Sequence, residues 1–200
     1  PIIVHSYLVA PEQTENIFKA MQAGAVAIAQ KPPGLGSPEA KPLVEKLVRT
    51  IKLMAEVKVV RRRPRKPRRH SAVASDKNRQ STAPSDIEMI AIGASTGGPP
   101  VLQKLFKDIP PDFPVPILVV QHIAAGFLAG MLEWLSRETR LALKVPQTGE
   151  TPMPGHIYFA PEEGNMSLAD NGKILISQSA GQGQLKRPVS HLFSSVARHC

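Results

Sequence analysis

The chain has 200 residues, of which 42% are hydrophobic, which is enough for a packed core. No apolar run approaches the roughly 20 residues that span a bilayer, and the opening PIIVHSYLVAPEQ lacks the basic and long apolar regions of a secretory signal. The single cysteine, Cys200, excludes an internal disulfide and suits a reducing compartment. We therefore expect a cytoplasmic protein without membrane insertion. Because the sequence opens inside a strand pattern and ends inside a helix pattern, we also expect a fragment that is interrupted at both ends.

The formal net charge of +9 comes almost entirely from one tract. Residues 58–70, KVVRRRPRKPRRH, contain eight Lys and Arg and no acid, so 9 − 8 leaves about +1 for the rest. Around this tract, residues 57–85 are rich in Arg, Lys, Pro, Ser and Asn, a composition typical of a flexible tether. The composition therefore divides the chain into residues 1–56, a basic linker at 57–85, and residues 86–200.

The first zone alternates apolar runs with amphipathic segments. Strands are predicted at 1–6 and 25–30, and helices at 15–24 and 42–56. In the first helix Ile17, Phe18 and Met21 share one face, and Gly24 ends it. The β-α-β-α order predicts half of a doubly wound parallel sheet, which is too little to bury both faces alone.

The third zone repeats this alternation. Strands are predicted at 87–93, 114–122, 156–161 and 173–178, and helices at 99–109, 126–140 and 187–199. The stretch 162–172 is interpreted as a loop with hairpin character around Asp170, Asn171 and Gly172. The order of elements predicts an α/β domain with a doubly wound parallel sheet.

The stretch GASTG fits the pattern Gly-x-Ser-x-Gly and places Ser95 between a predicted strand and a predicted helix. Such an elbow exposes the serine hydroxyl near free backbone N–H groups, and Thr96 would supply the oxyanion-hole N–H. A tight turn without further meaning is the alternative. A phosphate cradle is disfavoured, because a dinucleotide fold needs glycine in place of Ser95 and a P-loop needs Lys and Ser or Thr in place of the prolines at 99 and 100.

His122 ends the next predicted strand, 27 residues after Ser95. Successive parallel strands end at the same edge of a sheet, so His122 could take the serine proton as general base. An acid to orient the imidazole is harder to place, because Asp108 and Asp112 lie at the opposite edge, and Glu162, Glu163 and Asp170 lie in a later loop. We expect the orienting acid beyond residue 200, which leaves a dyad here.

These segments together resemble the CheB family, the chemotaxis response regulators that are protein-glutamate methylesterases. IAIGASTGGPPVL, VVQHIAAGF and PGHIYFAPEEGNM carry the resemblance most strongly. It implies the C-terminal half of a flavodoxin-like receiver domain at 1–56, with Ser6 at the switch position and Lys31 at the phosphoryl-contacting lysine. The alternative for these two residues is a strand-end cap and a solvated lysine. The phosphorylated Asp and the Mg²⁺ ligands of a receiver would precede Pro1.

For residues 86–200 the resemblance implies the N-terminal part of a methylesterase domain with Ser95 as nucleophile, His122 as base and Thr96 beside the nucleophile. The implied reaction is hydrolysis of glutamate methyl esters on methyl-accepting chemotaxis receptors, with glutamine deamidation as a related activity and no cofactor for the esterase. A chemotaxis histidine kinase would control it by phosphorelay to the receiver. The family's triad Asp lies in a later Gly-rich segment, so we expect this chain alone to be weak or inactive. Two departures affect substrate fit: Asn165 and Met166 stand where many members have a histidine before an apolar residue, and the segment KRPVSHLF at 186–193 is shortened relative to the family's Arg-Pro-Ser segment.

The sequence alone leaves two alternative functions. The basic tract after half a receiver could belong to a DNA-binding response regulator, although no interleaved aromatics and no helix-turn-helix pattern accompany it, so we expect no nucleic-acid partner. A non-catalytic adaptor of the same fold is the second. Five histidines lie without ligand spacing, and we expect no metal site: His5, His70, His156, His191 and His199.

Overall fold

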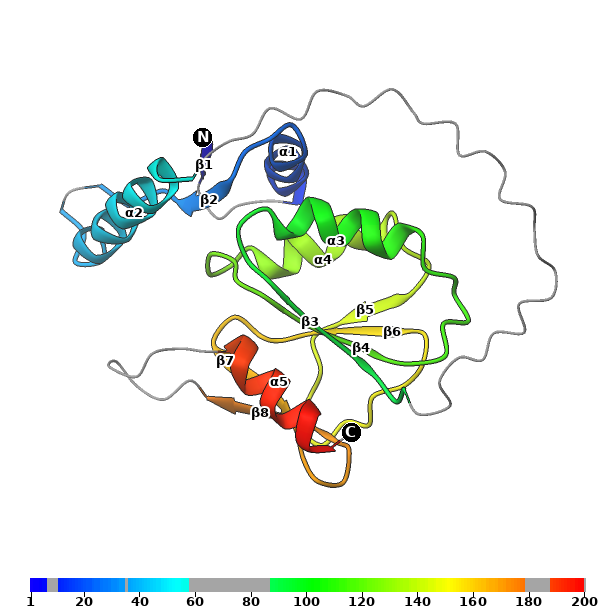
Figure 1. Cartoon of the computed structure of the whole chain (residues 1–200). Helices are drawn as coiled ribbons and strands as arrows, with labels where there is room; N and C mark the ends of the chain where they lie inside the picture. The colour runs from blue at the N-terminus through cyan, green and yellow to red at the C-terminus, as the bar shows by residue number, and fades with distance from the viewer. Residues whose placement is uncertain (7–10, 35, 58–86, 179–187, 200) are drawn as a thin grey trace, which may run out of the picture.

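The computed structural model describes residues 1–6, 11–34, 36–57, 87–178 and 188–199 (Figure 1). The linker predicted at 57–85 lies, except for Val57, outside the described residues. The elements in chain order are β1 Ile3–Ser6, α1 Pro11–Gln22, β2 Ala27–Gln30, α2 Ala40–Ala55, β3 Ile90–Ala94, α3 Gly98–Lys107, β4 Ile117–Gln121, α4 Leu128–Ser136, β5 Ala142–Lys144, β6 His156–Phe159, β7 Gly164–Leu168, β8 Ile174–Gln178 and α5 Pro188–His199.

A four-stranded parallel sheet, in the order β3-β4-β6-β5, forms the centre of the larger part of the molecule. Helices α3 and α4 cover one face, and α5 with the antiparallel β7–β8 hairpin covers the other (Figure 1). The strand β4 is buried along Ile117–Val120, as expected for a central strand between two layers. This arrangement confirms the predicted α/β class with a parallel sheet.

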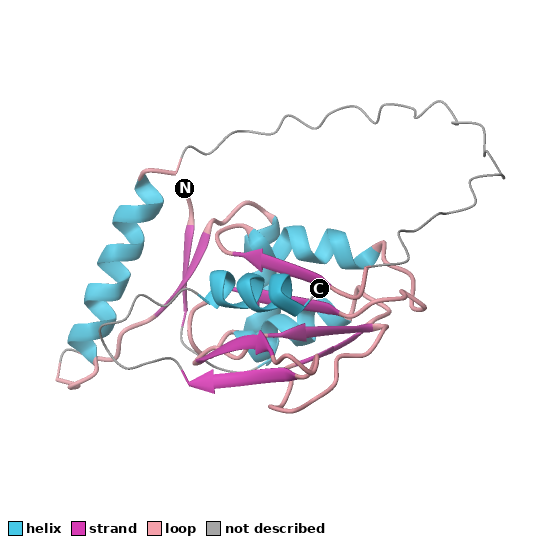
Figure 2. Ribbon diagram, turned by 60° about the horizontal axis from the view of Figure 1, so that its bottom comes forward, coloured by secondary structure: helices cyan, strands magenta, loops and turns pink. Residues whose placement is uncertain are grey.

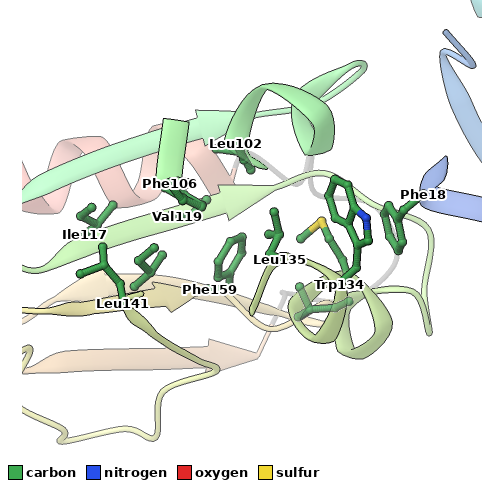
Figure 3. Close-up of a cluster of buried hydrophobic side chains, with 12 residues drawn as sticks. Phe18, Leu102, Phe106, Ile117, Val119, Trp134, Leu135, Leu141 and Phe159 are labelled. Carbon is green, nitrogen blue, oxygen red and sulfur yellow. The ribbon is translucent and has the colours of Figure 1, made fainter. Parts of the chain in front are cut away.

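Two apolar clusters hold these layers on the sheet. The cluster under α3 and α4 is centred on Phe106, Val119, Leu135 and Phe159 (Figure 3). The opposite cluster joins Leu118 and Tyr158 of the sheet to residues of the hairpin and α5. Alternate residues of β4 thus face different clusters, because successive side chains of a strand point to opposite faces.

The N-terminal segment, defined as residues 1–6, 11–34 and 36–57, forms a two-stranded parallel sheet with two helices. Strand β1 pairs with β2 from Ile3↔Ala27 to Ser6↔Gln30, and the long helix α2 lies alongside this small sheet (Figure 2). The buried face of α1 consists of Ile17, Phe18 and Met21, as the sequence predicts. Gly24 follows the helix with φ of +117°, a conformation that favours glycine.

Helix α1 packs against α3 and α4 and so joins the N-terminal segment to the larger sheet. Phe18 is fully buried and stacks on Trp134 with ring centroids 4.9 Å apart, at one end of the apolar cluster (Figure 3). Arg137 Nη1 lies 2.7 Å from Glu15 Oε2. Hydrogen bonds from Lys19 and then Arg137 hold the pKa of the Glu15 carboxyl below its usual range. The stabilisation from this carboxylate is therefore present at neutral pH and is lost as the pH falls through the lowered pKa.

Sequence patterns missed two strands. Strand β5 has only three residues, Ala142–Lys144, at the edge of the sheet, where both outer residues are exposed and no long apolar run can form. Strand β7, GNMSL, falls within the stretch that the sequence predicts as a loop, because it contains no β-branched or aromatic residue. Its pairing with β8 through a turn at Gly172, with φ of +74°, confirms the predicted hairpin character. Helix α1 begins at Pro11, earlier than the predicted residue 15.

Among the described residues, no helix combines the length and apolar character that crossing a membrane requires.

Packing of α5 on the sheet leads to a prediction about Gly93. Its φ is not in the left-handed region, but a Cβ there would overlap with Val189 Cγ1 of α5 and come within 3.3 Å of Phe193. Because a branched valine in a helix cannot turn away, we expect Gly93→Ala to lower the free energy of unfolding by about 1–3 kcal/mol in urea titrations.

Gly36→Ala is the matched control, since nothing lies within 4 Å of a Cβ at that glycine. Adding Val189→Ala to Gly93→Ala should restore part of the loss. If Gly93→Ala and Gly36→Ala unfold at the same urea concentration, the packing of α5 against β3 is not as described.

Candidate active site

Ser95 and His122 lie directly after neighbouring parallel strands. The last residues of β3 and β4 are paired, Ala94 with Gln121, so the next residue of each strand is delivered at the same sheet edge. The backbone N–H of His122 donates to the Ala94 carbonyl at 2.9 Å, which extends the ladder by one residue. The side chains of both residues are exposed. The structure therefore brings the two predicted residues to one edge of the sheet.

A tight turn after β3 carries Ser95 into α3. The N–H of Gly98 donates to the Ser95 carbonyl at 2.8 Å, and Gly97 has φ of +74° at the residue before the helix. Proline at positions 99 and 100 has no N–H. Among the described residues, the N–H of Thr96 donates to no acceptor, so it remains available next to the serine hydroxyl. A free donor at this place is what an oxyanion hole needs.

One cavity of about 230 Å³ contains both predicted residues. Its lining includes Ser95, Thr96, Gln121 and His122 from the larger sheet. His122 also lines a second cavity of about 320 Å³, together with Glu162 and Asn165. His122 thus borders both cavities.

The N-terminal segment supplies the opposite wall of the smaller cavity. Met21 of α1, Val26 just before β2 and Ile28 of β2 contribute apolar side chains, while Lys46 and Thr50 of α2 contribute polar ones. Lys46 lines the second cavity as well. Residues from the first 57 positions of the chain and the serine therefore line one cavity.

Glu162 holds the loop that follows His122. Its Oε2 accepts from the Gly126 N–H at 2.6 Å, and its Oε1 accepts from the Leu128 N–H at 2.7 Å. A carboxylate at the start of α4 satisfies N–H groups that lack helical partners and interacts favourably with the positive end of the helix dipole. Both oxygens serve the backbone, so Glu162 anchors the loop and does not orient the imidazole.

No acid among the described residues hydrogen-bonds to the His122 ring. Asp108 ends α3 and Asp112 precedes β4, which puts both at the opposite edge of the sheet. Asp170 lies in the β7–β8 turn. Within the same residues, no group of three or more His, Cys, Asp or Glu is arranged to hold a metal ion. Ser95 and His122 are the residues in the smaller cavity whose side chains can act as a nucleophile and as a base.

The two residues assigned to a receiver switch also lie together, in the N-terminal segment. Ser6 ends β1, and its carbonyl accepts from the Lys31 N–H at 2.8 Å just after β2. Both residues thus stand at the carboxyl edge of the small parallel sheet. Their assigned roles in phosphoryl sensing remain predictions.

Two further residues were noted in the sequence as departures from the family pattern. Met166 is fully buried in the cluster between the sheet and α5, so it contributes to packing. Asn165 lines the larger cavity beside His122. Sequence reasoning missed Gln121, whose amide reaches the backbone of both Ser95 and His122. Its signal was a polar residue at the end of the otherwise apolar run ILVVQ.

A family model, curated relatives and a solved structure that are similar to this chain all carry a methylesterase description. A family model described as CheB methylesterase matches residues 90–200. A protein-glutamate methylesterase/protein-glutamine glutaminase of Nitrosospira multiformis is 39% identical over 202 residues, and a second of Syntrophus aciditrophicus is 39% identical over 199. Each alignment covers 99% of this chain, but the chain spans only 56% and 57% of these relatives' lengths. The crystal structure of the Thermotoga maritima CheB methylesterase catalytic domain superposes with a TM-score of 0.50 at 34% identity, covering 56% of this chain and 60% of that one.

Replacing Glu162 tests its role as an anchor. Glu162→Gln keeps the shape but removes the charge and replaces one acceptor oxygen by an NH2 group, which cannot accept from a backbone N–H, so one hydrogen bond to the loop is lost and the other is weakened. We expect about 1 kcal/mol lower stability by thermal or urea unfolding and faster amide exchange at Gly126 and Leu128. Glu163→Gln is the matched control, because its carboxylate makes no hydrogen bond within the described part of the chain. Equal exchange in the two variants would contradict the anchoring role.

Proposed function

The chain belongs to the CheB methylesterase family, and from this premise we propose that it uses Ser95 to hydrolyse glutamate methyl esters on chemoreceptors. The observation that carries the proposal is the delivery of Ser95 and His122 by paired strand ends into one cavity. Names of relatives add glutamine deamidation as a related activity of those proteins. Hydrolysis of an amide by the same groups would follow the same steps, with ammonia as the leaving group.

In the proposed reaction the Ser95 hydroxyl attacks the ester carbonyl while His122 accepts its proton. The Thr96 N–H donates to the oxyanion that forms. When the C–O bond to the methoxy group breaks, His122 returns the proton to the leaving oxygen and methanol departs. Water then attacks the acyl-enzyme, His122 takes its proton, and the serine is regenerated together with the glutamate carboxylic acid.

The proposal assigns orientation of the imidazole to a carboxylate that the described residues do not contain, because none of their acids bonds to the His122 ring. An imidazole without that partner adopts the wrong tautomer more often, which in serine proteases costs about 10⁴-fold in rate. The proposed reaction uses a nucleophile and a general base and requires no metal ion.

Regulation by the N-terminal segment is a second part of the proposal. We infer that residues 1–56 are the C-terminal half of a receiver domain and that they restrict access to Ser95. Support comes from the side chains of Met21, Val26 and Ile28, which line the same cavity as the serine. Phosphorylation of the receiver by a chemotaxis histidine kinase would then release this cover through the region of Ser6 and Lys31.

Two other functions are weaker. Family membership favours an esterase over a DNA-binding response regulator. The basic tract that would support DNA binding lies outside the described residues. A non-catalytic adaptor would not need a serine and a histidine in one cavity, nor a free N–H beside the serine. Cytoplasmic helical domains of methyl-accepting receptors are the proposed partners, and the proposed location is the cytoplasm.

The nucleophile is tested by methanol release from methylated receptor, measured with the whole protein. We expect Ser95→Ala to reduce the rate by about 10⁴-fold or more, because the acyl-enzyme can no longer form. Ser136→Ala is the matched control, since Ser136 is exposed at the end of α4 and lines neither of the two cavities that contain His122. Similar rates for Ser95→Ala and the unchanged protein would end the assignment.

The covering role of the N-terminal segment is tested by Phe18→Ala, which removes the stack on Trp134 that joins α1 to α4. We expect hydrolysis of the receptor ester to become faster, while hydrolysis of a small soluble glutamate methyl ester changes less, because a small ester needs less space. Phe193→Ala, which removes a ring that is 43% exposed on α5, is the control. A slower receptor reaction in Phe18→Ala, with an unchanged melting temperature, would contradict the proposal.

A further inference from the structure

The side-chain amide of Gln121 connects the two proposed catalytic residues through their backbones. Its Nε2 donates to the Ser95 carbonyl at 2.9 Å and to the His122 carbonyl at 2.8 Å. A primary amide has two N–H groups, so each carbonyl receives one of them. Gln121 is the last residue of β4 and thus lies between the turn after β3 and the start of the loop after β4.

The orientation of this amide is fixed by chemistry. If the group were rotated by 180°, Oε1 would face two carbonyl oxygens and both contacts would become repulsive. In the observed orientation Oε1 is buried and has no hydrogen-bond partner among the described residues. An unpaired buried oxygen costs free energy. In this orientation the amide therefore donates two hydrogen bonds through Nε2 and leaves Oε1 without a partner among the described residues.

Gly98 provides the space in which this amide lies. A Cβ at Gly98 would overlap with Gln121 Oε1 and come within 3.0 Å of Gln121 Cδ. The φ of Gly98 is not in the left-handed region, so its backbone would accept a side chain. Glycine at position 98 therefore leaves room mainly for the glutamine amide, and also for Ala94 Cβ, which would lie 3.0 Å from the added atom, whereas glycine at position 97 is favoured by its φ of +74°.

Each catalytic residue is fixed by two backbone contacts, one of which comes from Gln121. The Ser95 carbonyl also accepts from the Gly98 N–H within its own turn, and the His122 N–H also donates to Ala94. These other contacts hold each residue to the sheet edge or to its own turn. Among the residues that the structure describes, the Gln121 amide is the one side chain that donates to both carbonyls, so it links the backbone at the nucleophile to the backbone at the base within the placement that the β3–β4 pairing sets.

We propose that Gln121 is a positioning residue, which holds Ser95 and His122 in the relative placement that proton transfer needs. The inference rests on the proposed esterase function and deepens it. Gln121 touches neither substrate nor reacting atoms in this role. Because a displacement of about 1 Å in such a pair can cost about 10²-fold in rate, losing the amide should affect the chemical step far more than substrate binding.

The first test is Gln121→Met in the whole protein, which keeps the length of the side chain and removes both donors. We expect kcat for methanol release to fall by about 10- to 100-fold while KM changes by less than about twofold. Gln178→Met, at the exposed end of β8, is the control and should leave both constants unchanged. An unchanged kcat in Gln121→Met, or a rise in KM that accounts for the loss, would overturn the inference.

A second test applies even if Gln121→Met folds poorly. Gly98→Ala pushes the amide away while leaving it in the chain, whereas in Gln121→Ala the remaining close neighbour of the new methyl group is Ala94 Cβ, at 3.0 Å. We expect Gly98→Ala to lower kcat strongly in the unchanged protein and clearly less in the Gln121→Ala background. Equal effects in both backgrounds would show that Gly98 does not act through Gln121.

The outcomes also separate this inference from the proposed function. If the unchanged protein releases no methanol, the proposed function fails, and crystal structures of the unchanged protein and of Gln121→Met then decide the inference by themselves. A shift of Ser95 relative to His122 in the variant supports the positioning role. Identical placement of the two residues in both structures overturns it.

Discussion

The parallel pairing of β3 with β4 is the interaction on which the rest of the site depends. Its register places Ala94 opposite Gln121, and the next residue of each strand is a proposed catalytic residue. A shift of one residue in this pairing would turn the side chains of one strand to the other face and move Ser95 away from His122. The side chains of Ser95 and His122 can therefore act together only because the strand register brings them to the same place.

Burial on both faces of the sheet fixes that register. In β4 Val119 faces the cluster under α3 and α4, while Leu118 and Val120 face the cluster under α5 and the hairpin. Both clusters would lose contacts if the strand slipped. The apolar residues inside the strand therefore fix its register, and the polar residues that follow the strand form the proposed site. Gln121 stands at the boundary and connects the two neighbouring strand ends.

The sequence predicts the helices and strands that have a clear apolar periodicity, including the strands whose ends form the proposed site. The alternation of strands and helices gave the parallel sheet, and the carboxyl-edge rule placed Ser95 beside His122. Contacts between distant segments were not accessible in this way. Gly93 is needed because Val189 approaches from α5, and Glu162 reaches back to the loop after His122. Such roles depend on partners far away in the chain, so no local pattern indicates them. Strand β5 was missed because an exposed three-residue edge strand has too little apolar content.

Covalent labelling with a fluorophosphonate, mapped by peptide mass spectrometry on the whole protein, tests the central claim most directly. The reagent modifies serines whose proton a neighbouring base removes, and it requires no knowledge of the receptor substrate. The account predicts that the label is found on the peptide containing Ser95 and that His122→Ala prevents the labelling. Labelling of a different serine, or labelling of Ser95 that continues at the same rate without the imidazole, would contradict it.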